Sequence, residues 1–99
     1  MQKLPEGERK RRRAEYMQKK LARQRAIIQT IKLTAGCADC GYKEHPEALD
    51  FDHVRGEKLF NISMKAIGSL KRLLAEIEKC DVVCANCHRV RTAQRRSGR

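Results

Sequence analysis

The chain contains no tryptophan, and aromatic residues make up only 4% of its 99 residues. With so few large side chains the hydrophobic core must be thin, and a chain of this length forms one small domain. Below roughly 70–80 folded residues a hydrophobic core alone is usually marginal, and a metal ion or disulfides supply the missing stability. The composition therefore leads us to expect a metal or disulfide link.

Long apolar runs are also missing. No stretch is long enough to span a membrane, and the Arg-rich start has no hydrophobic signal segment near Met1. The cysteine count is odd, at five, which does not favour a framework of disulfides. We expect an intracellular, cytoplasmic protein in a reducing compartment, with no membrane partner.

Positive charge is abundant and unevenly distributed, with a formal net charge of +11. Residues 1–35 carry 11 basic and 3 acidic side chains, residues 36–87 carry 7 and 9, and residues 88–99 carry 5 and none. Basic ends around a slightly acidic centre favour a polyanion bound by the ends, with carboxylates in the centre left to bind metal. The alternative is that the charge only keeps the protein soluble.

A long basic helix is predicted over residues 8–35, which contain no proline or glycine. Residues 1–7 precede it as a flexible tail, and Gly36 follows as a candidate C-cap. Because its apolar residues share one side, we expect the C-terminal half of the helix to dock on the domain while the N-terminal half projects. That apolar stripe consists of Met17, Leu21, Ile28 and Ile31.

The rest of the chain shows shorter elements. Apolar and acidic residues alternate over 48–54, which predicts a strand. Leucines and an isoleucine at helical spacing predict a helix over 69–79, and residues 81–83 predict a second short strand. A basic helix starts at residue 86 or 87 and ends near 96, and residues 97–99 are expected to fray. The segment 59–63 is ambiguous between helix and strand.

Four cysteines form two Cys-x-x-Cys pairs, Cys37–Cys40 and Cys84–Cys87, separated by 43 residues. Two such pairs are the usual ligand set of a tetrahedral structural zinc site, provided that the intervening chain folds back. We therefore predict Zn²⁺ bound by all four thiolates and assign the fifth cysteine, Cys80, to the core. The alternatives are a redox dithiol and unrelated buried cysteines.

Asp52, His53 and His88 are further candidate functional residues. An aspartate next to a histidine in a strand places the two side chains on opposite faces. If Asp52 and His88 bound a divalent ion near the zinc site, the neutral imidazole of His53 could face a water and act as a general base. His45, beside a proline in a loop, is predicted to be structural.

These motifs together resemble an HNH endonuclease. The resemblance rests on the first Cys-x-x-Cys pair, on the segment Leu-Asp-Phe-Asp-His-Val at 49–54, and on Cys-Ala-Asn-Cys-His-Arg at 84–89, and it ends near Arg91 and Thr92. It covers about residues 37–92 and points to the small zinc-containing HNH proteins common in bacteriophages and bacteria. The implied fold is an α+β domain over 36–96, a ββα-metal finger next to a four-cysteine zinc site.

The resemblance also implies a reaction and the residues that perform it. Asp52 and His88 would bind a catalytic Mg²⁺ or Mn²⁺ ion, and His53 would be the general base that activates water against a DNA phosphodiester. Family members typically leave 5′-phosphate and 3′-hydroxyl ends, and many nick one strand at a time. A cytoplasmic location would be that of a bacterial or phage-infected cell.

One position departs from the family pattern. Family members often carry an asparagine nine residues before the last histidine, where its amide orients the base, but this chain has Lys79 there. Asn86, with some preference, or Asn61 could take that role, although Asn86 at a helix start could instead cap the backbone.

Double-stranded DNA is the expected partner, because few aromatic residues are present to stack on single-stranded bases. A non-catalytic zinc module that binds nucleic acid is the alternative function, and the chain could be a monomer or a dimer. The arginines expected to contact DNA phosphates are Arg9, Arg11, Arg12, Arg13, Arg89, Arg91, Arg95 and Arg96.

Overall fold

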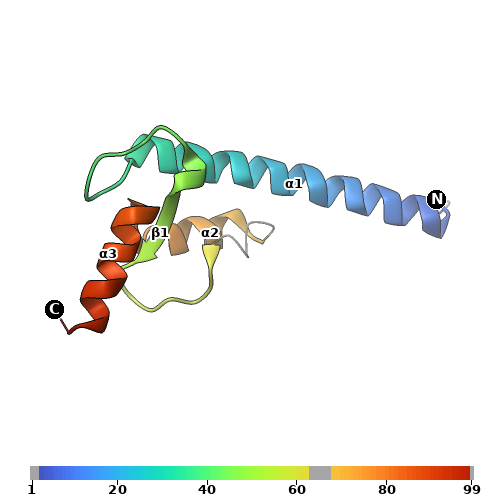
Figure 1. Cartoon of the computed structure of the whole chain (residues 1–99). Coiled ribbons are helices and arrows are strands. Elements are labelled where there is room, and N and C mark those ends of the chain that lie inside the picture. The colour runs from blue at the N-terminus through green and yellow to red at the C-terminus, as the bar shows by residue number, and fades with distance from the viewer. Residues whose placement is uncertain (1–2, 63–67, 99) are drawn as a thin grey trace.

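The computed structural model describes residues 3–62 and 68–98, and the expected α+β class is confirmed there (Figure 1). In these residues three α-helices accompany one antiparallel sheet of two strands. The elements are α1 (Glu6–Ala35), a short 3₁₀ helix η1 (Pro46–Ala48), β1 (Leu49–His53), α2 (Leu70–Ile77), β2 (Cys80–Cys84) and α3 (Ala85–Arg96). None of the helices in this part of the chain is both long and apolar enough to cross a membrane.

Helix α1 has 30 residues and begins at Glu6, two residues before the range expected from the sequence. Acidic side chains in its first turn suit the positive end of the helix dipole. The helix ends at Ala35, and the N–H of the next residue, Gly36, donates to Lys32 O at 2.8 Å. The φ of Gly36 is 68°. Residues with a side chain rarely adopt this φ, and a Cβ at Gly36 would lie 3.3 Å from Cβ of Lys43. Glycine at this position therefore lets the chain turn directly into Cys37.

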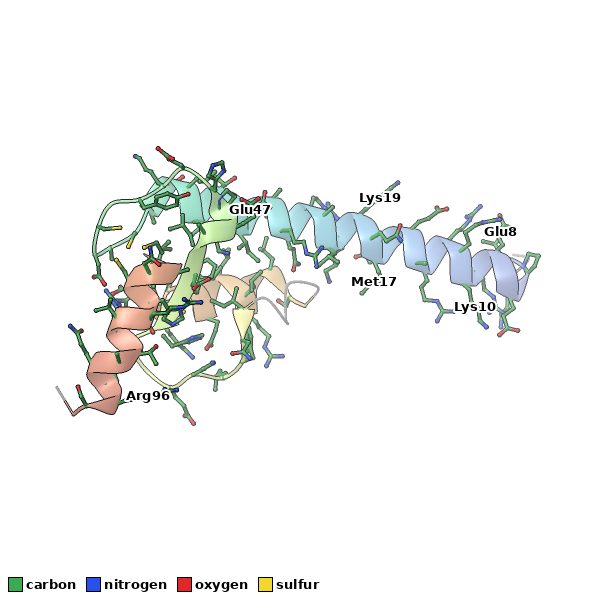
Figure 2. The ribbon with its side chains drawn as sticks, viewed as in Figure 1. Glu8, Lys10, Met17, Lys19, Glu47 and Arg96 are labelled. Atoms are coloured by element: carbon green, nitrogen blue, oxygen red, sulfur yellow. The ribbon has the colours of Figure 1, made fainter. Side chains whose placement is uncertain are left out.

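Only the C-terminal half of α1 packs on the domain, so the helix extends away from it and gives the molecule a longest dimension of 63 Å (Figure 1). Ile28 is buried and Leu21 packs against the same core cluster. Met17, assigned to the apolar stripe, is 40% exposed, because nothing in the described residues covers α1 that far from the domain. Figure 2 shows Lys10 and Lys19 on this projecting half.

Gln24 occupies a buried position on α1 that the apolar pattern did not mark. Its side-chain Nε2 donates to Gly68 O at 2.8 Å, which ties α1 to the start of the α2 region.

The two strands pair so that their residues alternate between two faces. Leu49 lies opposite Cys84 and His53 opposite Cys80. Because side chains alternate along a strand, His53 shares a face with Leu49 and Phe51, whereas Asp50 and Asp52 lie on the other face. Helix α3 packs on the aspartate face, and the apolar face packs on α1 and α2.

Two buried clusters form the core, and Phe51 packs against both. The buried members of the first are Ile28, Ile62, Leu73 and Cys80. Those of the second are Cys37, Leu49, Val82, Val83 and Cys84. Cys80 thus lies in the core, as the sequence indicated.

The shorter elements lie within one or two residues of their expected ranges. The segment 97–99 follows the last helix, with Ser97 and Gly98 in a turn. The predictions for residues 1–7, 59–63 and 97–99 extend past the described residues. Met1, Gln2, Ser63 and Arg99 lie outside them.

Candidate functional site

Four cysteine sulfurs converge between the loop after α1 and the start of α3, where Figure 2 shows the sulfur atoms gathered. The Sγ atoms of Cys37, Cys40, Cys84 and Cys87 all lie within 4.8 Å of one another. Cys40 Sγ and Cys84 Sγ are 3.7 Å apart, close to the roughly 3.8 Å between thiolates around a tetrahedral zinc with Zn–S bonds of about 2.3 Å. The cluster could hold a metal ion such as zinc.

The backbone of each pair supports this cluster. The N–H of Cys40 donates to Cys37 Sγ and the N–H of Cys87 to Cys84 Sγ, both at 3.4 Å. Burial disfavours the Cys37 thiolate, but hydrogen bonds from the backbone around Cys84, Cys40 and Asp39 outweigh it and lower the pKa of Cys37 to about 6. Such N–H groups stabilise the anionic sulfur that a metal requires.

A cleft of about 630 Å³ lies along the edge of β1 that has no partner strand in the described residues. Consecutive residues of β1 line it, so both faces of the strand contribute, together with α1, α3 and the loop after β1. Its lining residues are Lys32, Asp50, Phe51, Asp52, His53, Lys58, Asn61, Ile62, His88 and Arg95. The cleft therefore brings together the three residues expected to act on DNA.

His88 lies between two carboxylates of β1. Its Nδ1 is 3.0 Å from Asp50 Oδ2, and its Nε2 is 3.8 Å from Asp52 Oδ1. A carboxylate on one imidazole nitrogen orients the ring and leaves the other nitrogen for a metal. Neighbouring ligands of an octahedral Mg²⁺, with bonds of about 2.1 Å, are roughly 3.0 Å apart. His88 Nε2 and Asp52 Oδ1 would therefore have to approach each other from 3.8 Å to share such an ion.

Asp52 is 4% exposed and is also contacted by two arginines of α3. Arg95 makes a two-pronged contact, with Nη1 at 2.8 Å from Oδ1 and Nη2 at 2.7 Å from Oδ2, and Arg91 Nη1 is 2.9 Å from Oδ2. The hydrogen bond from Arg95, together with that from Arg91, lowers the pKa of Asp52 to about 2 against the opposing effect of burial. Binding an ion at Asp52 would require Arg95, whose side chain is half exposed, to move.

Arg91 does not fit the expected role of a phosphate contact. Its guanidinium holds Asp39 through two hydrogen bonds of 2.7 Å and also contacts Asp52 and Asp81. These carboxylates raise the pKa of Arg91, the largest effect coming from Asp39. Because three carboxylates share this one side chain, Arg91 fastens α3 to the first cysteine pair and to both strands.

His53 lies on the opposite face of β1 and contacts α2. Its Nε2 is 2.9 Å from Glu76 Oε2, and only 14% of its side chain is exposed. Lys79, which stands where the resembling family has asparagine, donates from Nζ to Glu76 Oε1 at 2.9 Å and to Glu57 O at 2.8 Å. The side chain of Lys79 is therefore connected to His53 through Glu76.

No family model, curated protein or solved structure matches this chain.

Asn86 is not among the residues that line the cleft. Helix α3 begins at Ala85, so Asn86 falls in its first turn, exposed beside Cys40 and Cys84 on the side of the sulfur cluster. Asn61, the other candidate, does line the cleft. Of the two asparagines, Asn61 is thus the one that lines the cleft together with His53.

Four cleft residues or neighbours were not singled out from the sequence: Lys32, Asp50, Lys58 and Glu76. Asp50 shares a strand face with Asp52, and this spacing of two was a usable signal. Lys32 comes from α1, with Nζ 5.4 Å from the centroid of the Phe51 ring. Burial lowers the pKa of Lys32, although Asp50 opposes the shift. No local pattern connects Lys32 or Glu76 to the cleft.

The remaining arginines expected to bind DNA are exposed. Arg9, Arg11, Arg12 and Arg13 lie on the projecting half of α1, and Arg12 pairs with Glu8 at 3.3 Å. Arg89 and Arg96 are exposed on α3. All six remain candidates for phosphate contacts.

Proposed function

We propose that this protein is a metal-dependent DNA endonuclease of the HNH type that hydrolyses phosphodiester bonds in the cleft beside β1. The observation that carries the proposal is the convergence of His53, Asp52 and His88 on one cleft. A strand edge, a helix and the cluster of four cysteines, which we assign to structural Zn²⁺, hold these residues together.

The charges around the cleft suit a phosphodiester substrate. Lys32, Lys58 and Arg95 provide three cations at its wall. Cations in a partly enclosed cleft attract phosphate and stabilise the extra negative charge that develops during phosphoryl transfer. The exposed arginines of α1 and α3 would hold neighbouring phosphates of double-stranded DNA.

Asp52 and His88 are the residues that would hold the catalytic Mg²⁺ or Mn²⁺, with Asp50 orienting His88. The chemistry that such an ion would supply there is stabilisation of the negative charge that develops during hydrolysis. Arg95, displaced from Asp52, would be free to contact a phosphate instead.

His53 is the residue to which we assign proton transfer. It takes a proton from a water as the water oxygen forms a bond to phosphorus and the bond from phosphorus to the 3′ oxygen breaks. The departing 3′ oxygen takes a proton from solvent, so the products are a 5′-phosphate and a 3′-hydroxyl, and His53 later returns its own proton to solvent. A positioned general base typically contributes roughly 10²–10⁴-fold to the rate.

The test is cleavage of supercoiled plasmid by the zinc-loaded protein with Mg²⁺ or Mn²⁺, compared with His53→Ala and His45→Ala. His45 is exposed in the loop before η1 and serves as the matched control. We expect metal-dependent nicking by the parent and by His45→Ala, and a loss of at least about 100-fold in His53→Ala. Equal cleavage by His53→Ala would refute the assigned base.

A second function, a non-catalytic zinc module that binds DNA, is favoured by one observation. Both oxygens of Asp52 are engaged by arginines, a state in which the carboxylate can be purely structural. This alternative predicts a zinc-loaded protein that binds duplex DNA but never nicks it at any Mg²⁺ or Mn²⁺ concentration, with His53→Ala binding as the parent does.

A further inference from the structure

Glu76 is a buried carboxylate in a helix that needs none for packing. It is 1% exposed and lies three residues after Leu73, which is also 1% exposed. An apolar side chain would fill this position on the buried face of α2 more cheaply, because a buried charge is costly unless it is fully paired. The partners of Glu76 therefore explain its presence.

Both carboxylate oxygens of Glu76 have partners. Oε2 is 2.9 Å from His53 Nε2 and accepts from the N–H of Leu59 at 3.0 Å, and Oε1 accepts from Lys79 Nζ at 2.9 Å. Burial alone would raise the pKa of Glu76, but Lys79 and the Leu59 N–H outweigh it and lower the pKa to about 2. At neutral pH Glu76 is thus ionised and can only accept hydrogen bonds.

The state of Glu76 determines which nitrogen of His53 carries the proton. A carboxylate that only accepts requires Nε2 of His53 to be the donor, so the neutral ring is the Nε2–H tautomer. The lone pair is then on Nδ1. Because His53 also lines the cleft, Nδ1 is the nitrogen available to a water there.

We propose that Glu76 is the positioning residue of His53, holding Nε2–H so that Nδ1 accepts the proton from the attacking water. This inference rests on the proposed nuclease function and deepens it. The ammonium group of Lys79 balances the charge of Glu76 and donates to both Glu76 Oε1 and Glu57 O. Lys79, at the position where the resembling family has asparagine, thereby acts on His53 through Glu76.

A purely structural role for Glu76 is the competing explanation, because its contact with the Leu59 N–H also fixes the loop that carries Lys58 and Asn61 to the cleft. A loss of activity alone would not separate the two. Two readings together do. Loss of a positioning contact changes the His53 tautomer and kcat and leaves KM unchanged, whereas displacement of the loop also changes KM, because Lys58 lines the cleft.

The experiment uses the zinc-loaded protein with ¹⁵N-labelled histidine and reads both ring nitrogens of His53 by long-range ¹H–¹⁵N NMR at a pH where the ring is neutral. We expect the parent to show Nε2–H with Nδ1 unprotonated. Glu76→Gln, which keeps the shape but removes the charge, should populate the Nδ1–H tautomer. Glu78→Gln, an exposed neighbour on the same helix end, is the matched control and should behave as the parent.

Cleavage kinetics provide the second reading. We expect Glu76→Gln to lower kcat by about 10- to 100-fold while KM for plasmid stays close to that of the parent, since the orientation of the base and not DNA binding is lost. A parent with Nδ1–H, or a folded Glu76→Gln with unchanged tautomer and kcat, would overturn the inference. If the variant does not fold, the spectrum of the parent alone still tests the predicted Nε2–H tautomer of His53.

Failure of the nuclease proposal gives a different pattern. A parent that never nicks DNA, yet shows Nε2–H on His53 that depends on Glu76, would refute the nuclease while supporting the contact. A parent that nicks DNA with a His53 tautomer insensitive to Glu76 would refute the positioning role alone.

Discussion

At the scale of single residues, ionised Glu76 links the candidate base to the packing of the domain. It holds His53, Lys79 and the Leu59 N–H from a position with almost no contact with solvent. Protonation would turn an acceptor of three hydrogen bonds into a group that cannot satisfy all three partners. The stability of the fold should therefore depend on the charge of this one carboxyl.

The pH dependence of stability follows from the lowered pKa of Glu76, about 2 in the folded protein against an ordinary 4.5. The ionised group stabilises the fold fully above pH 4.5, and this contribution is lost as the pH falls towards about 2. We expect the free energy of unfolding of the parent to exceed that of Glu76→Gln at neutral pH, and the difference to shrink across this window.

Urea unfolding at a series of pH values, with zinc held constant, measures this difference. Acid also releases zinc from both proteins, so the difference between them is the informative quantity. The same comparison with Glu78→Gln should stay flat. A difference for Glu76→Gln that does not change between neutral and acidic pH would contradict the assignment.

The sequence identified only part of the cleft at this scale. Asp52, His53 and His88 could be singled out because, together with the paired cysteines, they occur in the sequence order of the HNH motifs that the chain resembles. Glu76 could not, since a glutamate among leucines on a helix ordinarily belongs to the solvent-facing side. Only the approach of α2 to the end of β1, 23 residues away in sequence, brings it to His53.

At the scale of elements, Cys84 joins three parts of the structure. It is the last residue of β2, its Sγ accepts from the N–H of Cys87 as the cap of α3, and the same sulfur belongs to the cluster of four cysteines. The strand, the helix and the metal ligands therefore depend on one side chain. Two small buried clusters alone leave little reserve of stability.

Replacing Cys84 by serine should unfold or aggregate the domain, because metal binding and folding are coupled in a domain of this size. Zinc content by mass spectrometry and thermal unfolding by circular dichroism measure the effect. Cys80→Ala is the matched control, since Cys80 is buried outside the sulfur cluster and should leave one zinc bound. An unchanged melting temperature in Cys84→Ser would show that the cluster does not stabilise the fold.

The helices and strands themselves were largely predictable, for reasons that differ between them. Helix α1 has a long run without proline or glycine and a glycine at its end, and β1 shows a clear alternation. The extent of docking of α1 was not predictable, because Met17 is as apolar as Ile28 and only the position of the domain leaves it exposed. Gln24 was missed because a polar residue of a helix is expected to face solvent, and the position of the domain buries it.

At the scale of the whole molecule, the basic half of α1 reaches well beyond the domain that carries the cleft (Figure 1). A helix of 30 residues is about 45 Å long, enough to follow DNA over roughly one turn. We therefore expect α1 to supply affinity that is separate from the chemistry in the cleft.

Replacing Arg11, Arg12 and Arg13 together by glutamine should weaken duplex binding and lower the slope of log affinity against log salt by about 2 to 3, at roughly 0.9 per lost phosphate contact. Fluorescence anisotropy over a range of salt concentrations measures the slope. Lys43→Gln, in the loop after α1, is the control for loss of charge elsewhere. A triple variant with the parent's slope would place the DNA away from α1.

The central claim, that His53 moves a proton during DNA cleavage in this cleft, is tested most directly by chemical rescue. Supercoiled plasmid is incubated with Mn²⁺ and zinc-loaded His53→Ala, with and without added imidazole. Our account predicts nicking by the parent, almost none by the variant alone, and partial recovery in proportion to the imidazole concentration. A parent that leaves the plasmid intact, or a variant that nicks equally well without imidazole, would contradict it.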